Sequence, residues 1–365
     1  MPRTFRRFPP CHRRIGQLYS GVARPGGCTT PSSPIAMPII QVEGLTKEFR
    51  TYKKQPGLGG ALKGLFHRQY ERTVAVNDLR LSIEEGEFVG FLGPNGAGKT
   101  TTLKMLAGLL YPSSGNATVM GFVPWKRDDG YRRQFALLLG QKNQLWWDLP
   151  ARESLELNAK IYGIPREDFE QTVKEMTSLL GVSEKLSVMV RELSLGERMK
   201  MELTAALLHR PRVLFLDEPT IGLDVVSQKA VRGFLREYNA RHKTTIILTS
   251  HYMADIQELC ERVVIIDHGR LTFDGPLTEV VDKFADAKIL TVHFGSGAVR
   301  PDYDFSRFGE VLCREPSEVK VKISRDRVVP VCKALLDEFP VSDIDIQEIP
   351  IEEVIARVFA EGKAG

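Results

Sequence analysis

The sequence predicts an α/β fold: a mainly parallel sheet with crossover helices, followed by a smaller C-terminal α+β domain. Three observations lead to this prediction. Short apolar runs alternate with helix-like segments from residue 196 to residue 267, which is typical of parallel strands joined by helices. A glycine-rich loop separates an apolar strand from a helix near residue 93. Beyond residue 275 the alternation stops, and strand-like runs come before an amphipathic helix.

The chain has 365 residues, which is enough for one large domain and a smaller one. We expect a main domain at 37–275 with a helical subdomain at about 127–195, and an accessory α+β domain at 276–365. The leader, 1–36, holds six arginines and no acidic residue. It is interpreted as a disordered tail or a mis-assigned start, with Met37 as the true first residue, and the alternative is an organellar transit peptide.

Composition excludes several classes of protein. No apolar run approaches the roughly 18 residues of a membrane-spanning helix, so any membrane role is expected to depend on a partner. Outside the leader, 44 basic residues face 46 acidic ones, and no nucleic-acid partner is expected. The five cysteines show no metal-ligand spacing, which favours a reducing compartment without a zinc site.

The elements of the main domain are expected in this order. Strands are predicted at Ile39–Val42, Val74–Val76, Phe88–Leu92, Val213–Leu216, Thr245–Thr249 and Val263–Asp267, helices at Lys99–Leu109, Gly196–Leu208, Ser227–Asn239 and Met253–Glu261, and mostly helix between Arg127 and Val190. The basic stretch Arg50–Arg72 is either a solvated insertion, which we favour, or a membrane-facing loop.

The C-terminal region changes character after a linker at Asp274–Lys288. Strands are predicted at Lys288–His293, Val311–Arg314, Val319–Ile323 and Ile344–Ile349, with a helix at Val328–Phe339. Apolar residues at 351, 354, 355, 358 and 359 predict one final amphipathic helix.

The strongest motif runs from Gly93 to Thr100 and fits G-x-x-x-x-G-K-[ST] between a strand and a helix. Such a loop turns successive backbone N–H groups toward phosphate oxygens at a helix N-terminus. Lys99 is predicted to reach the β- and γ-phosphates of a nucleotide, and the Thr100 hydroxyl to bind Mg²⁺.

A pair of acids follows the apolar run Val213–Leu216, at the strand edge where α/β sheets bind ligands. Asp217 suits the magnesium shell. Glu218, one residue further on, is predicted to polarise the attacking water as a catalytic base.

The segment Leu193-Ser194-Leu195-Gly196-Glu197 lies directly before a helix and about 20 residues ahead of these acids. It resembles the LSGGQ motif of ATP-binding cassette (ABC) ATPases. Four further segments agree in order: Gln141 resembles the Q-loop, Gly222-Leu223-Asp224 the D-loop, His251 the switch histidine, and Phe49 or Tyr52 the adenine-stacking aromatic residue. The resemblance covers about Ile39–Gly275, and it implies a P-loop NTPase domain of the ABC type.

The resemblance implies a homodimer that encloses two MgATP, with Ser194 and the amides near Gly196 facing the γ-phosphate bound to the opposing subunit. Asp224 would stabilise this dimer, and Gln141 would sense the γ-phosphate. Leu195 stands where the family usually has Gly, and Glu197 where Gln is common.

The candidate site can therefore be stated in full. The expected catalytic residues are Glu218, His251 and Gln141, and the expected magnesium ligands are Thr100, Gln141 and Asp217. The expected nucleotide-binding residues are Phe49, Gly93, Pro94, Asn95, Gly96, Ala97, Gly98, Lys99, Thr100, Thr101, Ser194, Gly196, Glu197 and Asp224.

The wider pattern resembles the ATPase subunits of ABC-2-type exporters, which work with a separate membrane permease at the cytoplasmic face. Trp146 and Trp147 follow Gln141 closely, and at least one is expected on the permease-docking surface. The alternatives are an importer ATPase and a soluble ABC ATPase in translation or DNA repair. The single cassette, the lack of a heptad array and the amphipathic helix at the end favour the exporter.

Overall fold

The structure, a computed structural model, describes residues 37–52, 70–140, 142–284, 286–295, 303–351 and 353–355. The expectations for residues 1–36 and 53–69, and for the end of the chain beyond 355, lie outside the described residues.

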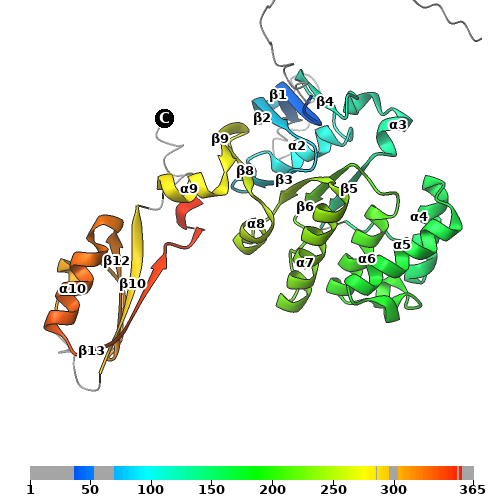
Figure 1. Ribbon diagram of the computed structural model, residues 1–365. Helices are drawn as coiled ribbons and strands as arrows, with labels where there is room; N and C mark the ends of the chain where they lie inside the picture. The colour runs from blue at the N-terminus through cyan, green and yellow to red at the C-terminus, as the bar shows by residue number, and fades with distance from the viewer. Residues whose placement is uncertain are drawn as a thin grey trace, which may run out of the picture. The chain divides into compact units, whose positions relative to one another are not determined.

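The main sheet has six strands in the order β5-β6-β7-β3-β8-β9 (Figure 1). They are β3 (Phe88–Leu92), β5 (Phe135–Leu139), β6 (Val213–Asp217), β7 (Thr245–Thr249), β8 (Arg262–Asp267) and β9 (Arg270–Pro276). The first five run parallel, and β9 pairs antiparallel with β8. The expected mainly parallel sheet is confirmed, and its carboxyl-terminal edge gathers the loops after β3, β6 and β7.

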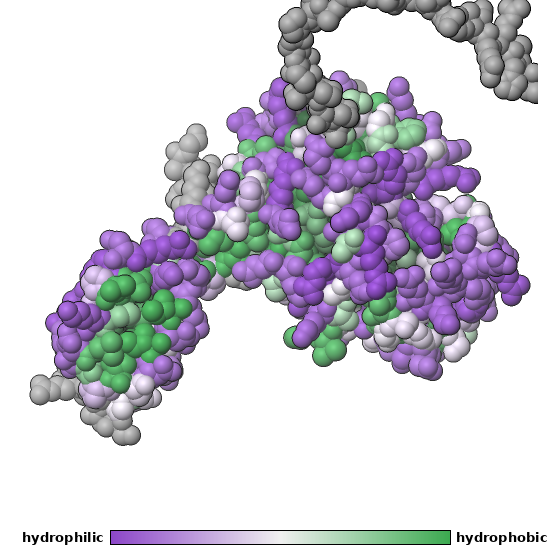
Figure 2. Space-filling view, viewed as in Figure 1, coloured by the Kyte–Doolittle hydropathy of each residue, from purple (hydrophilic) through white to green (hydrophobic). Residues whose placement is uncertain are grey.

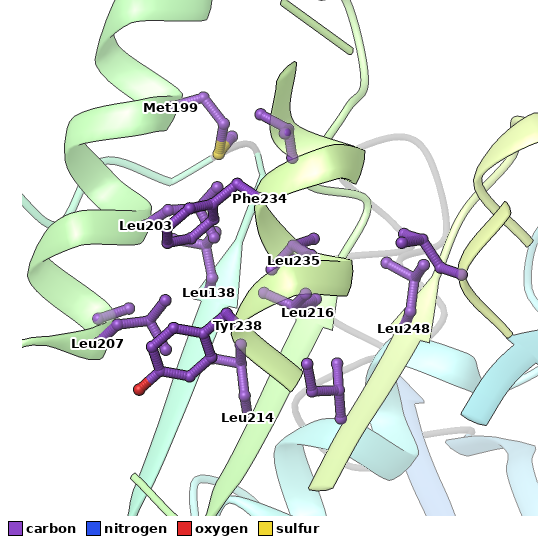
Figure 3. Packing of buried hydrophobic residues seen from close by; sticks show 14 of the residues in the cluster. Leu138, Met199, Leu203, Leu207, Leu214, Leu216, Phe234, Leu235, Tyr238 and Leu248 are labelled. Atoms are coloured by element: carbon purple, nitrogen blue, oxygen red, sulfur yellow. The ribbon is translucent and has the colours of Figure 1, made fainter. Parts of the chain in front are cut away.

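Helices follow the strands as crossover connections. They are α2 (Lys99–Leu106), α6 (Leu195–Leu207), α7 (Val225–His242) and α8 (Met253–Leu259). Figure 3 shows how α6 and α7 meet the sheet: Leu203 and Leu207 point toward Phe234 and Tyr238. Each of these four side chains is at most 5% exposed, so the cluster fixes both helices on the strands that carry the candidate acids.

A second, antiparallel sheet has the order β2-β1-β4, formed by β1 (Ile40–Tyr52), β2 (Tyr70–Ile83) and β4 (Ser114–Val119). Both β1 and β2 are much longer than the strands expected at their positions, and β4 was not expected. The backbones of Tyr52 and Tyr70 are paired, so the two ends of the basic stretch Arg50–Arg72 extend the β1–β2 ladder.

The expectation of a mostly helical region from Arg127 to Val190 needs a correction at its start. After the short helices η1 (Pro124–Lys126) and α3 (Asp129–Arg132) comes β5, which pairs with β6 in the main sheet. The helical subdomain therefore does not begin at about 127. Its helices are α4 (Ala151–Tyr162), α5 (Arg166–Leu179), η2 (Ser183–Lys185) and η3 (Val190–Glu192). A five-residue apolar run such as β5 carries too little periodicity to separate strand from helix.

The C-terminal body is a four-stranded antiparallel sheet in the order β11-β12-β10-β13, with α10 (Val328–Glu338). Its strands are β10 (Ala287–Phe294), β11 (Glu310–Arg314), β12 (Glu318–Ser324) and β13 (Val341–Glu348), and the turns η4 (Phe305–Arg307) and η5 (Arg325–Arg327) lie between them. The expected linker, Asp274–Lys288, contains the helix α9 (Leu277–Phe284). Hydrophobic residues reach the surface of this body in Figure 2, and on α10 Val329 is 76% exposed.

Among the described residues, no helix combines the length and the apolar composition that crossing a bilayer requires.

Candidate functional site

The glycine-rich loop connects β3 to α2 and is held against β2. Gly98 has φ 105°, and a Cβ there would lie 2.3 Å from the carbonyl oxygen of Ala75, so only glycine fits. The Ala97 amide donates to the Pro94 carbonyl oxygen (3.1 Å), and the Ala97 carbonyl accepts from Gly269 (3.0 Å). A Cβ built on Gly96 would have no atom within 4 Å. The loop thus has a fixed backbone and an open outer face.

Lys99 is buried, with 6% of its surface exposed. Its Nζ donates to the carbonyl oxygens of Gly93 (2.6 Å) and Pro94 (3.1 Å). Burial lowers the pKa of Lys99, and the carboxylates of Glu218 and Asp217 act in the opposite direction. The ammonium group is therefore held inside the loop, close to two acids, where the charge of a bound phosphate would compensate for its lost hydration.

Asp217 is the last residue of β6 and joins the ends of two neighbouring segments. The Thr100 Oγ1 donates to its carboxylate at 2.9 and 3.0 Å, and the Thr249 Oγ1 donates at 2.8 Å. Thr100 is the second residue of α2, and Thr249 is the last residue of β7. The expected magnesium ligands Thr100 and Asp217 are thus in direct contact.

Glu218 has a left-handed backbone, with φ 56°, which is strained for a residue with a side chain. Its amide donates to the carbonyl oxygen of Thr249 (3.0 Å). Its Oε1 lies 2.8 Å from Nε2 of His251, and the two side chains are 20% and 40% exposed. The two expected catalytic side chains, Glu218 and His251, are therefore in contact although they are 33 positions apart in the chain.

The segment around Gln141 is fixed at both ends, although Gln141 itself lies outside the described residues. On one side the Gly140 amide donates to the Asp217 carbonyl oxygen (2.8 Å). On the other side the Gln144 amide donates to both carboxylate oxygens of Glu202 (2.9 and 3.0 Å), and the Leu145 amide to one of them (3.4 Å). Glu202 was not predicted, because a single acid inside a helix gives no signal of burial.

Glu202 lies on α6 and is only 3% exposed. Burial raises the pKa of its carboxyl group, and the hydrogen bonds from Gln144 and Leu145 act in the opposite direction. This acid therefore attaches the segment after Gln141 to α6, the helix that Ser194 caps.

The N-terminus of α6 is a capping box. The Ser194 Oγ accepts from the Glu197 amide (3.3 Å), and the Glu197 Oε2 accepts from the Ser194 amide (2.9 Å). Lys185 lies 2.9 Å from Glu197, and the hydrogen bonds from Lys185 and then Ser194 lower the pKa of Glu197. The acid at the family's usual Gln position thus has a definite local role, and its contacts are within its own turn and with Lys185.

Gly196 is required by a close approach to α7. A Cβ at this position would lie 2.3 Å from Oγ of Ser227. Asp224 caps α7 by accepting from the Ser227 amide (2.9 Å) and hydroxyl (2.7 Å), and these bonds lower the pKa of Asp224. The expected D-loop residue and the expected LSGGQ-like residue are therefore neighbours. Ser227 was predicted only as the first residue of its helix, although an Asp just before a helical segment is an N-cap signal.

Several apolar side chains near these segments are exposed. Trp146 and Trp147 are 41% and 43% exposed, and the Arg198 guanidinium lies 5.2 Å from the Trp147 ring centroid. Val225 and Val226, directly after Asp224, are 75% and 77% exposed. Phe49, the expected adenine partner, is 38% exposed and lies under Lys47 (5.3 Å). The side chain of its alternative, Tyr52, is not among the described ones.

The arrangement fits a phosphate ester with a divalent cation. An open loop of amides and one lysine suits phosphate oxygens, while the hydroxyl and carboxylate of Thr100 and Asp217 are the oxygen donors that Mg²⁺ prefers. Glu218 and His251 supply an acid–base pair at the same edge of the sheet. Of the remaining residues expected to bind the nucleotide, Asn95 is exposed and Thr101 is half-buried.

Comparisons with known proteins agree with this chemistry. The family model described as "ABC transporter" matches residues 76–221, and the model "EvrA-like ABC transporter, C-terminal domain" matches residues 286–347. The chain is 36% identical over 208 residues to the ABC transporter ATP-binding protein NatA of Bacillus subtilis, covering 57% of this chain and 84% of that protein. It is 30% identical to the linearmycin resistance ATP-binding protein LnrL of the same organism, covering 78% and 92%.

Solved structures agree as well. An ATP-binding subunit of an ABC transporter has a TM-score of 0.56 at 27% identity, covering 67% of this chain and 93% of that one. A dimeric ATP-binding cassette bound to ADP and Pi shares the fold, with a TM-score of 0.55 at 22% identity, covering 65% and 98%. The chain therefore belongs to the ABC transporter family, as a nucleotide-binding, ATP-hydrolysing subunit.

Proposed function

We propose that two copies of this chain enclose two MgATP and that their hydrolysis drives a separate permease of an export system at the cytoplasmic face of the membrane. The observation that carries the proposal is the meeting of Lys99, the Thr100–Asp217 pair and the Glu218–His251 pair at one edge of the main sheet. A motor subunit needs phosphate binding, metal binding and water activation at one place, and this edge offers a residue for each.

The catalytic roles follow from the contacts. Glu218 accepts a proton from the attacking water, and His251, 2.8 Å from it, holds the carboxylate in place and contacts the γ-phosphate. Lys99 exchanges its bonds to the Gly93 and Pro94 carbonyls for phosphate oxygens. Thr100 and Asp217, which are hydrogen-bonded to each other, would hold Mg²⁺, and this ion would supply positive charge against the phosphates.

The second half of each site comes from the other copy. Ser194 and the amides near Gly196, at the N-terminus of α6, face the γ-phosphate across the dimer. Asp224 lies beside them, since Gly196 packs on Ser227, which Asp224 binds. The exposed Val225 and Val226 support burial of this surface on dimerisation, because adjacent apolar side chains gain free energy when they leave water.

Permease docking is assigned to the surface around Trp146 and Trp147. Both rings are more than 40% exposed, and the loop that carries them is bonded through Gly140 to Asp217 and through Gln144 to Glu202. Gln141, between these anchors, senses the γ-phosphate. A change in the nucleotide can thus reach the Trp pair through backbone contacts.

The remaining expectations stand as part of the proposal. The main domain takes residues 37–275 and the accessory domain 276–365, and the adenine ring stacks on Phe49. The exporter assignment is favoured over an importer or a soluble role because the relative LnrL carries the name of a resistance protein.

The test uses the Glu218→Gln variant. It should bind MgATP but lose about 10²–10⁴-fold in turnover, the range that general-base catalysis supplies, and accumulate as an ATP-bound dimer. Turnover at the unmodified rate would overturn the assignment of Glu218.

The same variant, tagged and purified from detergent-solubilised membranes with ATP, identifies the partner. One or two multi-spanning proteins are expected. Recovery of cytosolic partners alone would contradict the permease-driving role while leaving the ATPase chemistry intact.

A further inference from the structure

Asp255 is a fully buried acid that the proposed mechanism does not use. It lies in the first turn of α8, and its side chain is 0% exposed. Three donors reach its carboxylate: the Thr220 hydroxyl, the Ser250 hydroxyl at 2.6 Å and the Arg232 Nη1 at 3.0 Å. A buried carboxylate with three hydrogen bonds from three different segments is a strong constraint on their relative positions.

The two hydroxyl donors flank the catalytic pair. Thr220 comes two residues after Glu218, and Ser250 directly precedes His251. The Ser250 Oγ also accepts from the Tyr252 amide (3.0 Å), so the turn that presents His251 is bonded on both sides of that residue. Asp255 thereby connects the segment that leaves β6 to the segment that leaves β7.

The third donor fixes the acid itself. Arg232, on α7, is 9% exposed and pairs with both Asp255 and Glu258. Burial alone would lower the pKa of Arg232, and its hydrogen bonds to the two acids outweigh this and raise it. Because both side chains of the Arg232–Asp255 pair are anchored on helices, the carboxylate is a rigid point to which the two catalytic segments are tied.

We propose that Asp255 is a positioning residue for ATP hydrolysis, which sets the contact between Glu218 and His251 through its bonds to Thr220 and Ser250. The proposal rests on the proposed roles of Glu218 and His251. A shift of one ångström in a catalytic group costs up to about 100-fold in rate. The rate of hydrolysis should therefore depend on these two hydroxyl groups, which themselves touch no reacting atom.

The experiment uses the full chain and measures kcat and KM for MgATP together with the melting temperature. Substitution of Asp255 itself could prevent folding, so the experiment changes its two hydroxyl donors. Thr220→Val and Ser250→Ala each remove one donor and leave the Arg232–Asp255 pair in place, and we expect both variants to fold. Thr177→Val is the matched control, since the Thr177 hydroxyl is equally buried and donates to the Val173 carbonyl (2.7 Å) in α5.

We expect each hydroxyl variant to lower kcat about 3- to 10-fold with KM within about twofold of the unmodified protein, and Thr177→Val to leave kcat unchanged. The decisive measurement repeats both substitutions in a His251→Ala background. If the hydroxyls act by placing His251 against Glu218, their loss should then cost less than about 1.5-fold, because coupled residues are not additive.

Four results would contradict the proposal. Equal losses with and without His251, or unchanged kcat in both hydroxyl variants, would overturn the positioning role and leave the proposed function standing. A decrease in melting temperature without a decrease in kcat would reduce Asp255 to a structural acid. If His251→Ala itself left kcat unchanged, the proposed role of His251 would fail first, and the positioning proposal with it.

Discussion

The carboxyl-terminal edge of the main sheet and the N-terminus of α6 carry the two halves of the candidate site, and they satisfy their polar groups in different ways. At the sheet edge, side chains far apart in sequence contact one another: Thr100 with Asp217, and Glu218 with His251. At α6, Ser194 and Glu197 bond within one turn. The first half is built by the fold of a single chain. The second is a local cap next to exposed apolar residues, as expected of a surface that is completed by another copy.

The sharpest test of this difference is Lys99→Ala at the sheet edge. We expect ATP affinity to fall by about 10²–10³-fold, equal to about 3–4 kcal/mol, since a buried ammonium that binds phosphate oxygens is lost. In the absence of nucleotide, the melting temperature of the Lys99→Ala variant should stay the same or rise. Burial lowers the pKa of Lys99, which means that the buried charge costs free energy in the folded state, and the variant no longer carries it.

The measurement is the rise in melting temperature on addition of MgATP, which reports binding to the folded state. Lys104→Ala, a lysine on the same helix outside the site, is the control and should keep the full rise. If the Lys99→Ala protein still showed the same rise as the unmodified chain, Lys99 would not bind the phosphates of ATP at the sheet edge.

Glu202 links the two halves and should give the next largest effect. Glu202→Leu removes the acceptor of the Gln144 and Leu145 amides. Because Leu145 is buried, we expect a loss of about 1–3 kcal/mol in the free energy of unfolding, the cost of an unsatisfied buried group. Glu202→Gln keeps one acceptor oxygen and should cost less than half as much. Urea unfolding of the two variants against the unmodified chain measures the difference.

The pH dependence provides a second check on Glu202. Burial raises the folded-state pKa of Glu202 above its ordinary value of 4.5, so the unmodified chain loses stability as pH rises from 4.5 through the folded-state pKa. Glu202→Gln cannot titrate, and its stability relative to the unmodified chain should improve over that window. An offset that does not change with pH would show that the carboxyl group is not buried as described.

The exposed valines next to Asp224 test the second half. Val226→Asp, in the Glu218→Gln background, places a charge where two copies are proposed to meet, and should weaken ATP-dependent dimerisation at least about tenfold, or about 1.4 kcal/mol. Size-exclusion chromatography with MgATP measures it. Val329→Asp on α10 is matched in exposure, at 76% against 77%, and should leave the dimer unchanged. Equal behaviour of the two variants would place the interface elsewhere.

The sequence predicted the fold best where a pattern is local. The glycine loop, the strand before Asp217 and the helix after Asp224 are each specified by contiguous residues, and all three lie in the structure as expected. β5 was missed because a five-residue apolar run in a helical context has no distinguishing period. The capping box at Ser194 and Glu197 could have been found, since Ser-x-x-Glu before an apolar run is its known pattern.

Burial of single acids could not have been predicted from the same residues. Glu202 and Asp255 look like ordinary charged positions on helices, and only tertiary contacts reveal that one accepts two loop amides and the other two catalytic-segment hydroxyls. Partners at sequence separations of 35 and 58 residues leave no local trace, so the supporting contacts of a site escape sequence patterns more readily than its motifs do.

The smallest expected effect concerns Glu197, and it tests whether this acid acts only as a local cap of α6. Glu197→Gln keeps an oxygen that can accept from the Ser194 amide, so the capping box survives, and only the ion pair with the partly exposed Lys185 is lost. The cost in the free energy of unfolding at pH 7 should stay below about 1 kcal/mol. The hydrogen bond from Lys185 lowers the folded-state pKa of Glu197 below its ordinary value of 4.5. The pair therefore stabilises the folded state above pH 4.5, and its contribution disappears as pH falls through the folded-state pKa. The melting temperatures of the two proteins, measured from pH 7 to pH 3, should therefore converge at the acidic end. Lys185→Met is a control that should show the same convergence.

If Glu197→Gln instead lowered ATP turnover at pH 7 without a change in stability, the acid would act on the nucleotide of the opposing copy. The N-terminus of α6 would then be more than a local cap.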